Sequence, residues 1–392
     1  MNRKTIRDVE LKGKHVLVRA DFNVPVENGA VADDWRIEST LPTIRYLLDQ
    51  GAAVVIMSHL GRPKGEPKPE FSLKPVAQAL EDKLERPVTF VPDCVGDASL
   101  EQTQALQAGS VALLENTRFH KEEKDNDKDF SAALARHGDV LVDDAFAVSH
   151  RAHASNVGVA EHLPAIAGLL MEREVDALAR IKDQPGKPYV AIFGGAKISG
   201  KAKTLERTAE KADWLLLGGG LANTALHARG LHVGQSLVDE ESVDVLQDLM
   251  QRHGEKVVLP EDVVILRADD TQDAVPVDRI PSDARILDVG PRSIDRYLEY
   301  ARTAANVVWN GPVGNFEQPP FDRGTLRLAE QLAQVAAKLY VGGGDTIRAL
   351  AATAGTDAYE HVSTGGGAFL SFLAGEDLPG LQVIQTKGRR VA

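Results

Sequence analysis

The residues with the clearest chemical meaning lie where short apolar runs end in glycine. The run Tyr189–Phe193 leads into Gly194–Lys197 and on to Gly200 and Lys201, and a polar helical pattern follows. A glycine turn between a strand and a helix leaves free backbone N–H groups at the positive end of a helix dipole, where a phosphate binds well. Lys197 and Lys201 would add mobile positive charge there. This segment predicts a phosphate-binding loop.

The same arrangement recurs in the second half of the chain. Apolar runs precede three further glycine runs, Gly218–Gly220, Gly342–Gly344 and Gly365–Gly367. In a parallel α/β sheet, ligands bind at the carboxyl edge of the strands, and glycines let the backbone come close to them. One such run is equally consistent with a tight turn. Several runs at strand ends predict a nucleotide site.

Strands in the first half should end in charged and polar residues instead. If these strands are parallel, their basic side chains converge above one sheet edge, namely Arg36, His59, Arg62, Arg118 and Arg151. The planar guanidinium fork suits bidentate binding of phosphate or carboxylate. A single arginine is usually a solvated surface residue paired with a carboxylate. A set that recurs at strand ends predicts a site for a small, multiply charged anion.

Composition limits the class of protein. A chain of 392 residues should form two or three domains, and its net charge of −12 argues against general nucleic-acid or membrane partners. The single cysteine, Cys94, excludes an internal disulfide framework and fits a reducing compartment, and we expect it to pack in the core. The polar N-terminus and the lack of long apolar runs predict a soluble cytoplasmic protein.

Short β-rich runs alternate with helical patterns, which indicates βαβ units, parallel sheets and an α/β fold. Residues 171–182 carry apolar side chains at helical spacing, and Pro185-Gly186 and Pro188 then break the pattern. We place a domain boundary here. The expected strands are His15–Arg19, Ala53–Met57, Val111–Leu114, Val140–Val142, Tyr189–Phe193, Trp214–Leu217, Val257–Leu259, Val307–Trp309, Lys338–Val341 and a short run before Gly365.

Metal-ligand and acid–base patterns are weaker. His150 and His153 are three residues apart, but the chain has no His-Glu-x-x-His motif and no cysteine ligand set. Asp143 and Asp144 are adjacent, so in a strand their side chains would face opposite ways. We expect these two carboxylates to have a structural or positioning role.

Taken in chain order, these motifs resemble the signatures of the phosphoglycerate kinase family over essentially the full length. The matching segments are Val18–Pro25, Ser58–Pro63, Leu114–His120, Asp144–Phe146, His150–Ala154, Gly194–Lys197, Trp309–Gly314, Gly342–Thr346 and Ser363–Ala368. The resemblance implies two Rossmann-like lobes with parallel sheets, joined by a hinge helix. Residues 1–170 would bind 3-phosphoglycerate or 1,3-bisphosphoglycerate, 171–188 would form the hinge helix and linker, 189–379 would bind nucleotide, and the tail 380–392 would pack back on the N-terminal lobe.

The resemblance further implies reversible phosphoryl transfer between 1,3-bisphosphoglycerate and ADP, giving 3-phosphoglycerate and ATP with Mg²⁺, by a protein that is typically a monomer. Asp21, Asn23 and Arg36 would orient the glycerate end, with Arg36 also balancing charge on the reacting carboxyl group. His59, Arg62, Arg118 and Arg151 would hold the 3-phosphate. Lys197, Gly366 and Gly367 would act on the transferring phosphoryl group. Asp345 would position the metal. The nucleotide would be bound by Lys201, Gly218, Gly219, Gly290, Asn310, Glu317, Gly343, Gly344, Asp345 and Thr346.

Three positions depart from the family pattern. Asp143 stands where the family commonly has Asn, Ala147 where it has Gly, and Gly200 where it has Asp. The first two change charge and turn freedom near the basic site, and the third removes a carboxylate beside the two lysines. None is a residue to which the resemblance assigns chemistry.

Two other function classes remain open on the residues alone. A P-loop NTPase would use Gly195, Gly200 and Lys201 as a Walker A motif, but Ala202 follows, and it has no hydroxyl for Mg²⁺. A non-catalytic clamp for an anion explains the arginines, but it does not explain Lys197, Asp345 and the glycine runs. A dehydrogenase would need an early G-x-G-x-x-G motif, which is absent from the sequence.

Overall fold

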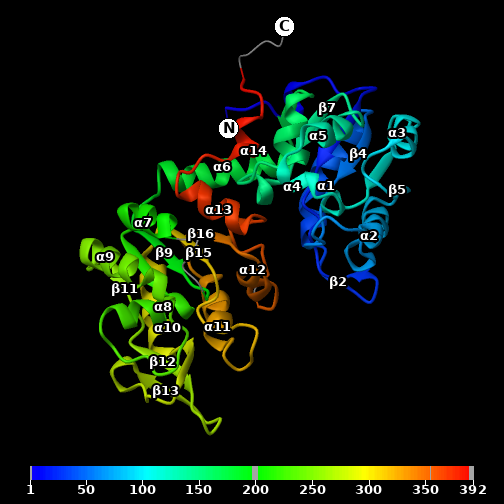
Figure 1. Ribbon diagram of the computed structural model, residues 1–392. Coiled ribbons are helices and arrows are strands. Elements are labelled where there is room, and N and C mark those ends of the chain that lie inside the picture. Colours follow the sequence, from blue (N-terminus) through cyan, green and yellow to red (C-terminus); the bar gives the residue numbers. More distant parts are fainter. Residues whose placement is uncertain (1, 197–201, 354, 388–392) are drawn as a thin grey trace. The chain divides into compact units, whose positions relative to one another are not determined.

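The structure is a computed structural model that describes residues 2–196, 202–353 and 355–387. The chain forms two compact units (Figure 1). Unit 1 contains the residues up to Asp176 together with the segment from Asp377, and unit 2 contains Ala177–Glu376.

Unit 1 is built on a six-stranded sheet in which every strand pair is parallel. Its order is β5 (Val88–Val91), β6 (Val111–Leu114), β4 (Ala53–Met57), β1 (His15–Arg19), β7 (Val140–Asp143) and β8 (Ala165–Ala167). The expected strands of the first half are confirmed, and β5 and β8 are additional edge strands. The chain leaves β1 toward β4 first and later returns to its other side with β7. Such a reversal of strand order opens a crevice at the carboxyl edge.

Apolar side chains cover both faces of this sheet, as parallel sheets require. Val16 and Val18 pack on one face with helices α1 (Trp35–Asp49) and α2 (Lys74–Leu84), whereas Leu17 packs on the other with α5 (Lys128–Ala135). This alternation follows from the two-residue period of a strand. The remaining elements of unit 1 are β2 (Val26–Glu27), β3 (Ala30–Val31), α3 (Asp97–Gln104), α4 (Glu122–Asp125) and α14 (Pro379–Gln382).

The segment around α14 lies beside the N-terminus in unit 1 (Figure 1). The Arg3 guanidinium donates to the Ile384 carbonyl oxygen at 2.8 Å, and the Gln385 N–H donates to the Ala165 carbonyl oxygen at 3.0 Å. These contacts join the two ends of the chain at the β8 edge of the sheet.

Unit 2 has a second six-stranded parallel sheet. Its order is β11 (Val257–Val258), β10 (Trp214–Leu217), β9 (Tyr189–Phe193), β15 (Asn306–Asn310), β16 (Lys338–Gly342) and β17 (His361–Ser363). This is the doubly wound order of a Rossmann sheet, with its switch point between β9 and β15. The helices of unit 2 are α7 (Ala202–Lys211), α8 (Gly219–Ala228), α9 (Val243–His253), α10 (Pro291–Thr303), α11 (Arg323–Leu332), α12 (Gly344–Ala351) and α13 (Gly366–Leu373).

Unit 2 also contains a small antiparallel sheet that the sequence did not lead us to expect. Its strands are β13 (Gln272–Pro276), β12 (Asp262–Leu266) and β14 (Arg285–Val289), in that order. The outer strand β13 is mostly exposed and carries few apolar residues, so it lacks the alternation that reveals a half-buried strand.

The expected helix at the domain boundary is α6 (Leu169–Asp183), and the division between the units falls within it, after Asp176. Asp144, directly after β7, fixes its first turn, because Asp144 Oδ1 accepts from the N–H groups of Leu170 and Met171 at 2.9 and 3.0 Å. No helix among the described residues combines the length and apolar character needed to cross a membrane.

Candidate functional site

Four of the basic residues expected in the first half follow strands β6, β4 and β7, which lie within the spatial order β6, β4, β1 and β7. Arg118 follows β6, His59 and Arg62 follow β4, and Arg151 lies in the segment after β7. Their charges act on one another. The pKa of Arg118 is lowered to about 10, chiefly by burial and then by the fields of nearby arginines that include Arg151 and Arg62. The structure thus brings these side chains to one sheet edge.

His59 lies among this positive charge and is held neutral. Burial lowers its pKa well below the usual value, and the guanidinium groups of Arg19, Arg118 and Arg36 lower it further. Its Nδ1 atom accepts from Arg19 Nη2 at 3.1 Å. A neutral imidazole with Nδ1 as acceptor carries its proton on Nε2, so His59 can donate one hydrogen bond from Nε2.

Arg36 on α1 forms an ion pair with Asp21, which follows β1. The Asp21 side chain is almost fully buried and that of Arg36 is about one quarter exposed. Asn23 Oδ1 accepts from the Gly61 N–H at 2.8 Å, which ties the loop after β1 to the loop after β4. Asp21, Asn23 and Arg36 are therefore held by neighbouring groups before any ligand binds.

A buried network that no sequence motif predicted lies next to these residues. Arg19, at the end of β1, is fully buried, donates from Nε to Ser155 Oγ at 2.7 Å and lies 4.0 Å from Glu123 Oε1. The Ser155 hydroxyl in turn donates to Glu123 Oε1 at 2.6 Å. An arginine inside an apolar strand signals a need for a buried acidic partner, but no local pattern in the sequence identifies Glu123.

Some hydrogen-bonding atoms in and beside the basic cluster are unused among the described residues. Arg118 Nε and His153 Nδ1 are buried and have no hydrogen-bond partner within the part of the chain that the structure describes. Burial and then the charges of Arg19, Arg118 and Arg151 lower the pKa of His153 to about 3. The positive charge of this edge therefore resides on the arginines.

In unit 2 the glycine runs lie at the carboxyl ends of four strands of one parallel sheet, β10, β9, β16 and β17, as expected. Gly219 opens α8 with φ of +59°, and Gly343 precedes α12 with φ of +101°, conformations that side chains rarely allow. A Cβ atom on Gly366 would lie 3.6 Å from the Cα atom of Gly343, so the N-termini of α12 and α13 are neighbours. Both present backbone N–H groups at this edge.

A cavity of about 360 Å³ opens beside these turns. Gly219, Glu317 and Asp345, all expected to bind nucleotide, line it. Apolar side chains form much of its wall, including Leu237, which is 53% exposed, and Phe316. A cavity with a partly apolar wall next to helix N-termini can hold a flat base against the apolar side chains and phosphates at the helix N-termini.

Other expected nucleotide residues do not line this cavity among the described residues. Asn310 donates from Nδ2 to the Gly342 carbonyl oxygen at 2.9 Å, and Thr346 Oγ1 accepts from the Gly311 N–H at 2.9 Å. Gly290 is the N-cap of α10 beside the carboxylate of Asp262. Asn310 and Thr346 thus connect the ends of neighbouring strands. The adjoining turns contain Gly218, Gly343, Gly344, Gly366 and Gly367. The described residues do not include Lys197, Gly200 and Lys201.

Asp345 is the residue that fits a divalent cation. Its side chain is about half exposed and lines the cavity at the start of α12. Mg²⁺ in proteins is commonly held by one or two carboxylates together with substrate phosphates and water. Asp345, beside the helix N-termini, supplies such a carboxylate. Its guanidinium partner is Arg348, which also reaches Glu317.

Asp143 and Asp144 have structural roles, as expected. Asp143 Oδ1 accepts from the Ala145 N–H at 3.1 Å, and Asp144 caps α6. Burial raises the pKa of Asp143 to about 6 and that of Asp144 to about 7. The Oδ2 atom of each has no hydrogen-bond partner among the described residues, which fits groups that are protonated over part of the accessible pH range.

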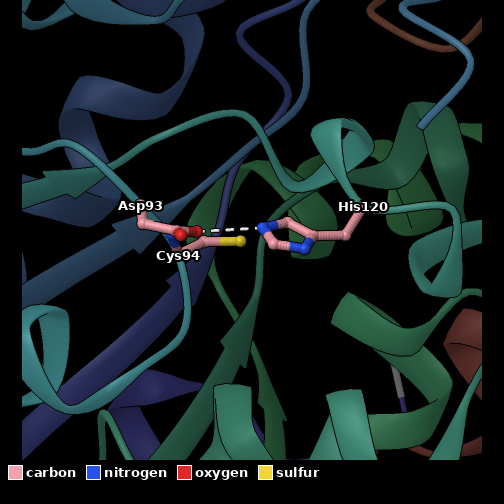
Figure 2. Close-up of side chains that lie close together, drawn as sticks. All are labelled: Asp93, Cys94 and His120. Carbon is pink, nitrogen blue, oxygen red and sulfur yellow. Dashed lines mark hydrogen bonds and ion pairs between the residues drawn. The ribbon is translucent and has the colours of Figure 1, made fainter. Parts of the chain in front are cut away.

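Asp93, Cys94 and His120 form a cluster that no sequence motif predicted (Figure 2). His120 Nε2 and Asp93 Oδ1 are 2.9 Å apart, and the hydrogen bond to Asp93 raises the pKa of His120. Cys94 is fully buried in the core, as expected, and burial raises the pKa of its thiol well above the usual value. A neutral, inaccessible thiol beside an ion pair is a packed side chain and not a nucleophile.

Comparison with known proteins places this geometry in a family. The phosphoglycerate kinase family profile matches residues 6–376. The chain belongs to the phosphoglycerate kinase family. A curated phosphoglycerate kinase from Pelotomaculum thermopropionicum is 46% identical over 99% of this chain and 100% of its own length. One from Chloroflexus aurantiacus is 48% identical over 98% of this chain and 99% of its own length.

Solved structures agree with the sequence relatives. Phosphoglycerate kinase from Coxiella burnetii has a TM-score of 0.83 and 41% identity, and covers 97% of this chain and 98% of its own. The Pyrococcus horikoshii phosphoglycerate kinase has a TM-score of 0.88 and 32% identity over the same shares. Membership confirms the expected fold and class of enzyme, a phosphotransferase that uses a carboxyl group as phosphoryl acceptor and acts on small-molecule substrates with ATP or ADP.

Proposed function

We propose that this chain catalyses reversible Mg²⁺-dependent phosphoryl transfer between 1,3-bisphosphoglycerate and ADP, giving 3-phosphoglycerate and ATP. The observation that carries the proposal is the cluster of arginines around a neutral His59 at the carboxyl edge of the unit 1 sheet. Such a cluster suits a small molecule with several negative charges. The glycine turns and cavity of unit 2 supply the matching nucleotide site.

In unit 1, four side chains would bind the 3-phosphate. Arg62 and Arg151 are exposed and can rotate onto a ligand, whereas Arg118 is held by its hydrogen bond to the Gly61 carbonyl oxygen at 3.0 Å. His59 would donate from Nε2. Asp21 and Asn23 would orient the glycerate hydroxyl and carboxyl end, with Arg36 balancing the charge of the reacting carboxylate.

In unit 2, the first turns of α8, α12 and α13 would hold the nucleotide and the transferring group. The nucleoside part of the nucleotide would be contacted by Gly218, Gly219, Gly290, Asn310 and Glu317. Its phosphates would be contacted by Gly343, Gly344, Thr346 and Lys201. Lys197, Gly366 and Gly367 would stabilise the charge of the transferring phosphoryl group. The roles of Lys197 and Lys201 rest on the family resemblance.

Asp345 would hold Mg²⁺, which, when bound with nucleotide, neutralises phosphate charge. The acceptor oxygen belongs to a carboxylate that is already ionised at neutral pH, so the reaction needs no general base. The chain's own contribution is alignment of the two substrates and stabilisation of charge. We further expect a cytoplasmic monomer without nucleic-acid or membrane partners.

A coupled assay tests this proposal. The enzyme is supplied with ATP, Mg²⁺ and 3-phosphoglycerate, and glyceraldehyde-3-phosphate dehydrogenase reports 1,3-bisphosphoglycerate through oxidation of NADH. We expect NADH oxidation that requires both substrates. ATP hydrolysis without 3-phosphoglycerate would favour a P-loop-like NTPase, and binding of both ligands without turnover would favour a non-catalytic anion clamp.

A further inference from the structure

Arg348 on α12 binds three residues that line the unit 2 cavity. Its Nη2 atom lies 2.6 Å from Asp345 Oδ1 and 3.4 Å from Glu317 Oε1. Its guanidinium carbon lies 5.8 Å from the centre of the Phe316 ring, within the range of a cation–π contact. Asp345, Glu317 and Phe316 all line the cavity. One cation therefore holds together two carboxylates and an aromatic wall.

This arrangement contributes little to the stability of the fold. The side chains of Arg348, Asp345 and Glu317 are 52%, 52% and 76% exposed, and ion pairs so exposed to water have small effects on folding. The position of the contact is more informative than its strength. Arg348 places its positive charge against the carboxylate that is the candidate ligand for a divalent cation.

We propose that Arg348 is a positioning residue that acts as the counter-ion of Asp345 and Glu317 in the nucleotide-free cavity and sets the Mg²⁺ dependence of ADP binding. This inference rests on the proposed function. When Mg²⁺ binds with ADP, the Asp345 carboxylate would become a ligand of the metal, so the ion pair between Asp345 and Arg348 would open. Binding of metal-free ADP leaves the pair intact, and the guanidinium then masks two carboxylates that would otherwise repel the phosphates.

The consequence is a change in the coupling between metal and nucleotide. In Arg348→Ala, metal-free ADP meets two uncompensated carboxylates and should bind more weakly. ADP with Mg²⁺ no longer competes with a guanidinium and should bind equally well or more tightly. The ratio of the two dissociation constants, without and with Mg²⁺, should rise by roughly 2- to 5-fold, the size expected for one partly exposed charge.

Calorimetric titration with ADP, in EDTA and in saturating Mg²⁺, measures this ratio without reference to turnover. Arg348→Lys keeps the charge and should restore most of the metal-free ADP affinity. Arg327→Ala is the matched control, because Arg327 forms an exposed pair with Asp295 in the same unit and neither residue lines the cavity. Its ratio should equal that of the wild type.

The outcomes separate this inference from the proposed function. An unchanged ratio in folded Arg348→Ala would overturn the counter-ion role alone. Equal weakening of ADP binding with and without Mg²⁺ would also overturn it, because Arg348 would then contact the nucleotide itself. Wild-type protein that binds no ADP under either condition would overturn the proposed function as well.

Discussion

At the scale of single residues, buried charges prepare the basic edge of unit 1 for a ligand. Glu123 is fully buried between Arg19 and Ser155, and burial raises its pKa despite the opposing field of Arg19. Ser155 accepts from Arg19 Nε and donates to Glu123, which holds the Arg19 guanidinium with Nη2 in hydrogen-bond contact with His59 Nδ1. Buried charges of this kind are retained only when well paired, so the network organises the site at a cost to stability.

Asp143 offers a pH-dependent test of this cost. Its folded-state pKa of about 6 lies above the ordinary value of 3.8, so the folded protein binds more protons than the unfolded chain between these values. The stability contributed by the protonated carboxyl group is therefore present below about pH 4 and lost as pH rises through about 6.

We expect Asp143→Asn, which introduces the family's common residue, to raise the free energy of unfolding at pH 8 by on the order of 1–2 kcal/mol. The amide oxygen can still accept from the Ala145 N–H. Urea unfolding at pH 4 and pH 8 measures the effect, which should vanish at pH 4. A variant that is less stable than wild type at pH 8 would show that the Asp143 charge is stabilising.

Cys94 provides a second residue-scale test. Because the thiol is buried and its pKa is raised, we expect native protein to react slowly with Ellman's reagent, and denatured protein to react at once. His120→Ala removes the ring that lies against Asp93 and Phe130, and should speed the reaction in folded protein. Immediate reaction of the native wild type would contradict the packed-thiol assignment.

At the scale of elements, strands were predictable wherever an apolar run was both buried and continuous. Strands were predicted at Val16–Val18 and Val54–Ile56 because the sheet is covered on both faces, which requires continuous apolar runs there. The short edge strands β5 and β8 and the exposed β13 carry weaker patterns. Arg62 and Arg151 could be predicted at the sheet edge because their motifs stand at strand ends. Glu123 contacts Arg19 and Ser155, and Arg348 contacts Glu317, and these partners lie far away in the sequence.

The start of α6 gives an element-scale prediction. Asp144→Ala removes the oxygen that accepts two N–H groups of the first turn, and loss of such a cap typically costs about 1–2 kcal/mol of stability. Asp144→Asn retains an acceptor and should recover most of the loss. Denaturant unfolding of both variants measures this. Equal stability of the alanine variant and the wild type would rule out a capping role.

At the scale of the whole molecule, the residues proposed to bind the anion belong to unit 1, and the cavity proposed to bind nucleotide belongs to unit 2. Phosphoryl transfer requires the reacting atoms to come within about 3–3.5 Å of each other. We therefore predict that the two units close on substrates through residues 171–188, where α6 ends in a segment with Pro185, Gly186 and Pro188.

Small-angle scattering tests this closure. The radius of gyration should fall most with both substrates bound and only partly with one, because each ligand contributes part of the interaction that favours the closed state. An unchanged radius with both substrates, under conditions in which calorimetry shows both to be bound, would count against closure.

The assignment of one ligand to each unit is the central claim, and calorimetry on Arg62→Ala tests it most directly. Arg62 is exposed, so its loss should leave the fold intact, as should that of the exposed control Arg136→Ala. We predict that 3-phosphoglycerate binding weakens roughly 10- to 100-fold in Arg62→Ala, the range for one lost charged hydrogen bond, while ADP binding and both affinities of the control stay unchanged. Equal losses of affinity for 3-phosphoglycerate and ADP in Arg62→Ala would contradict the assignment.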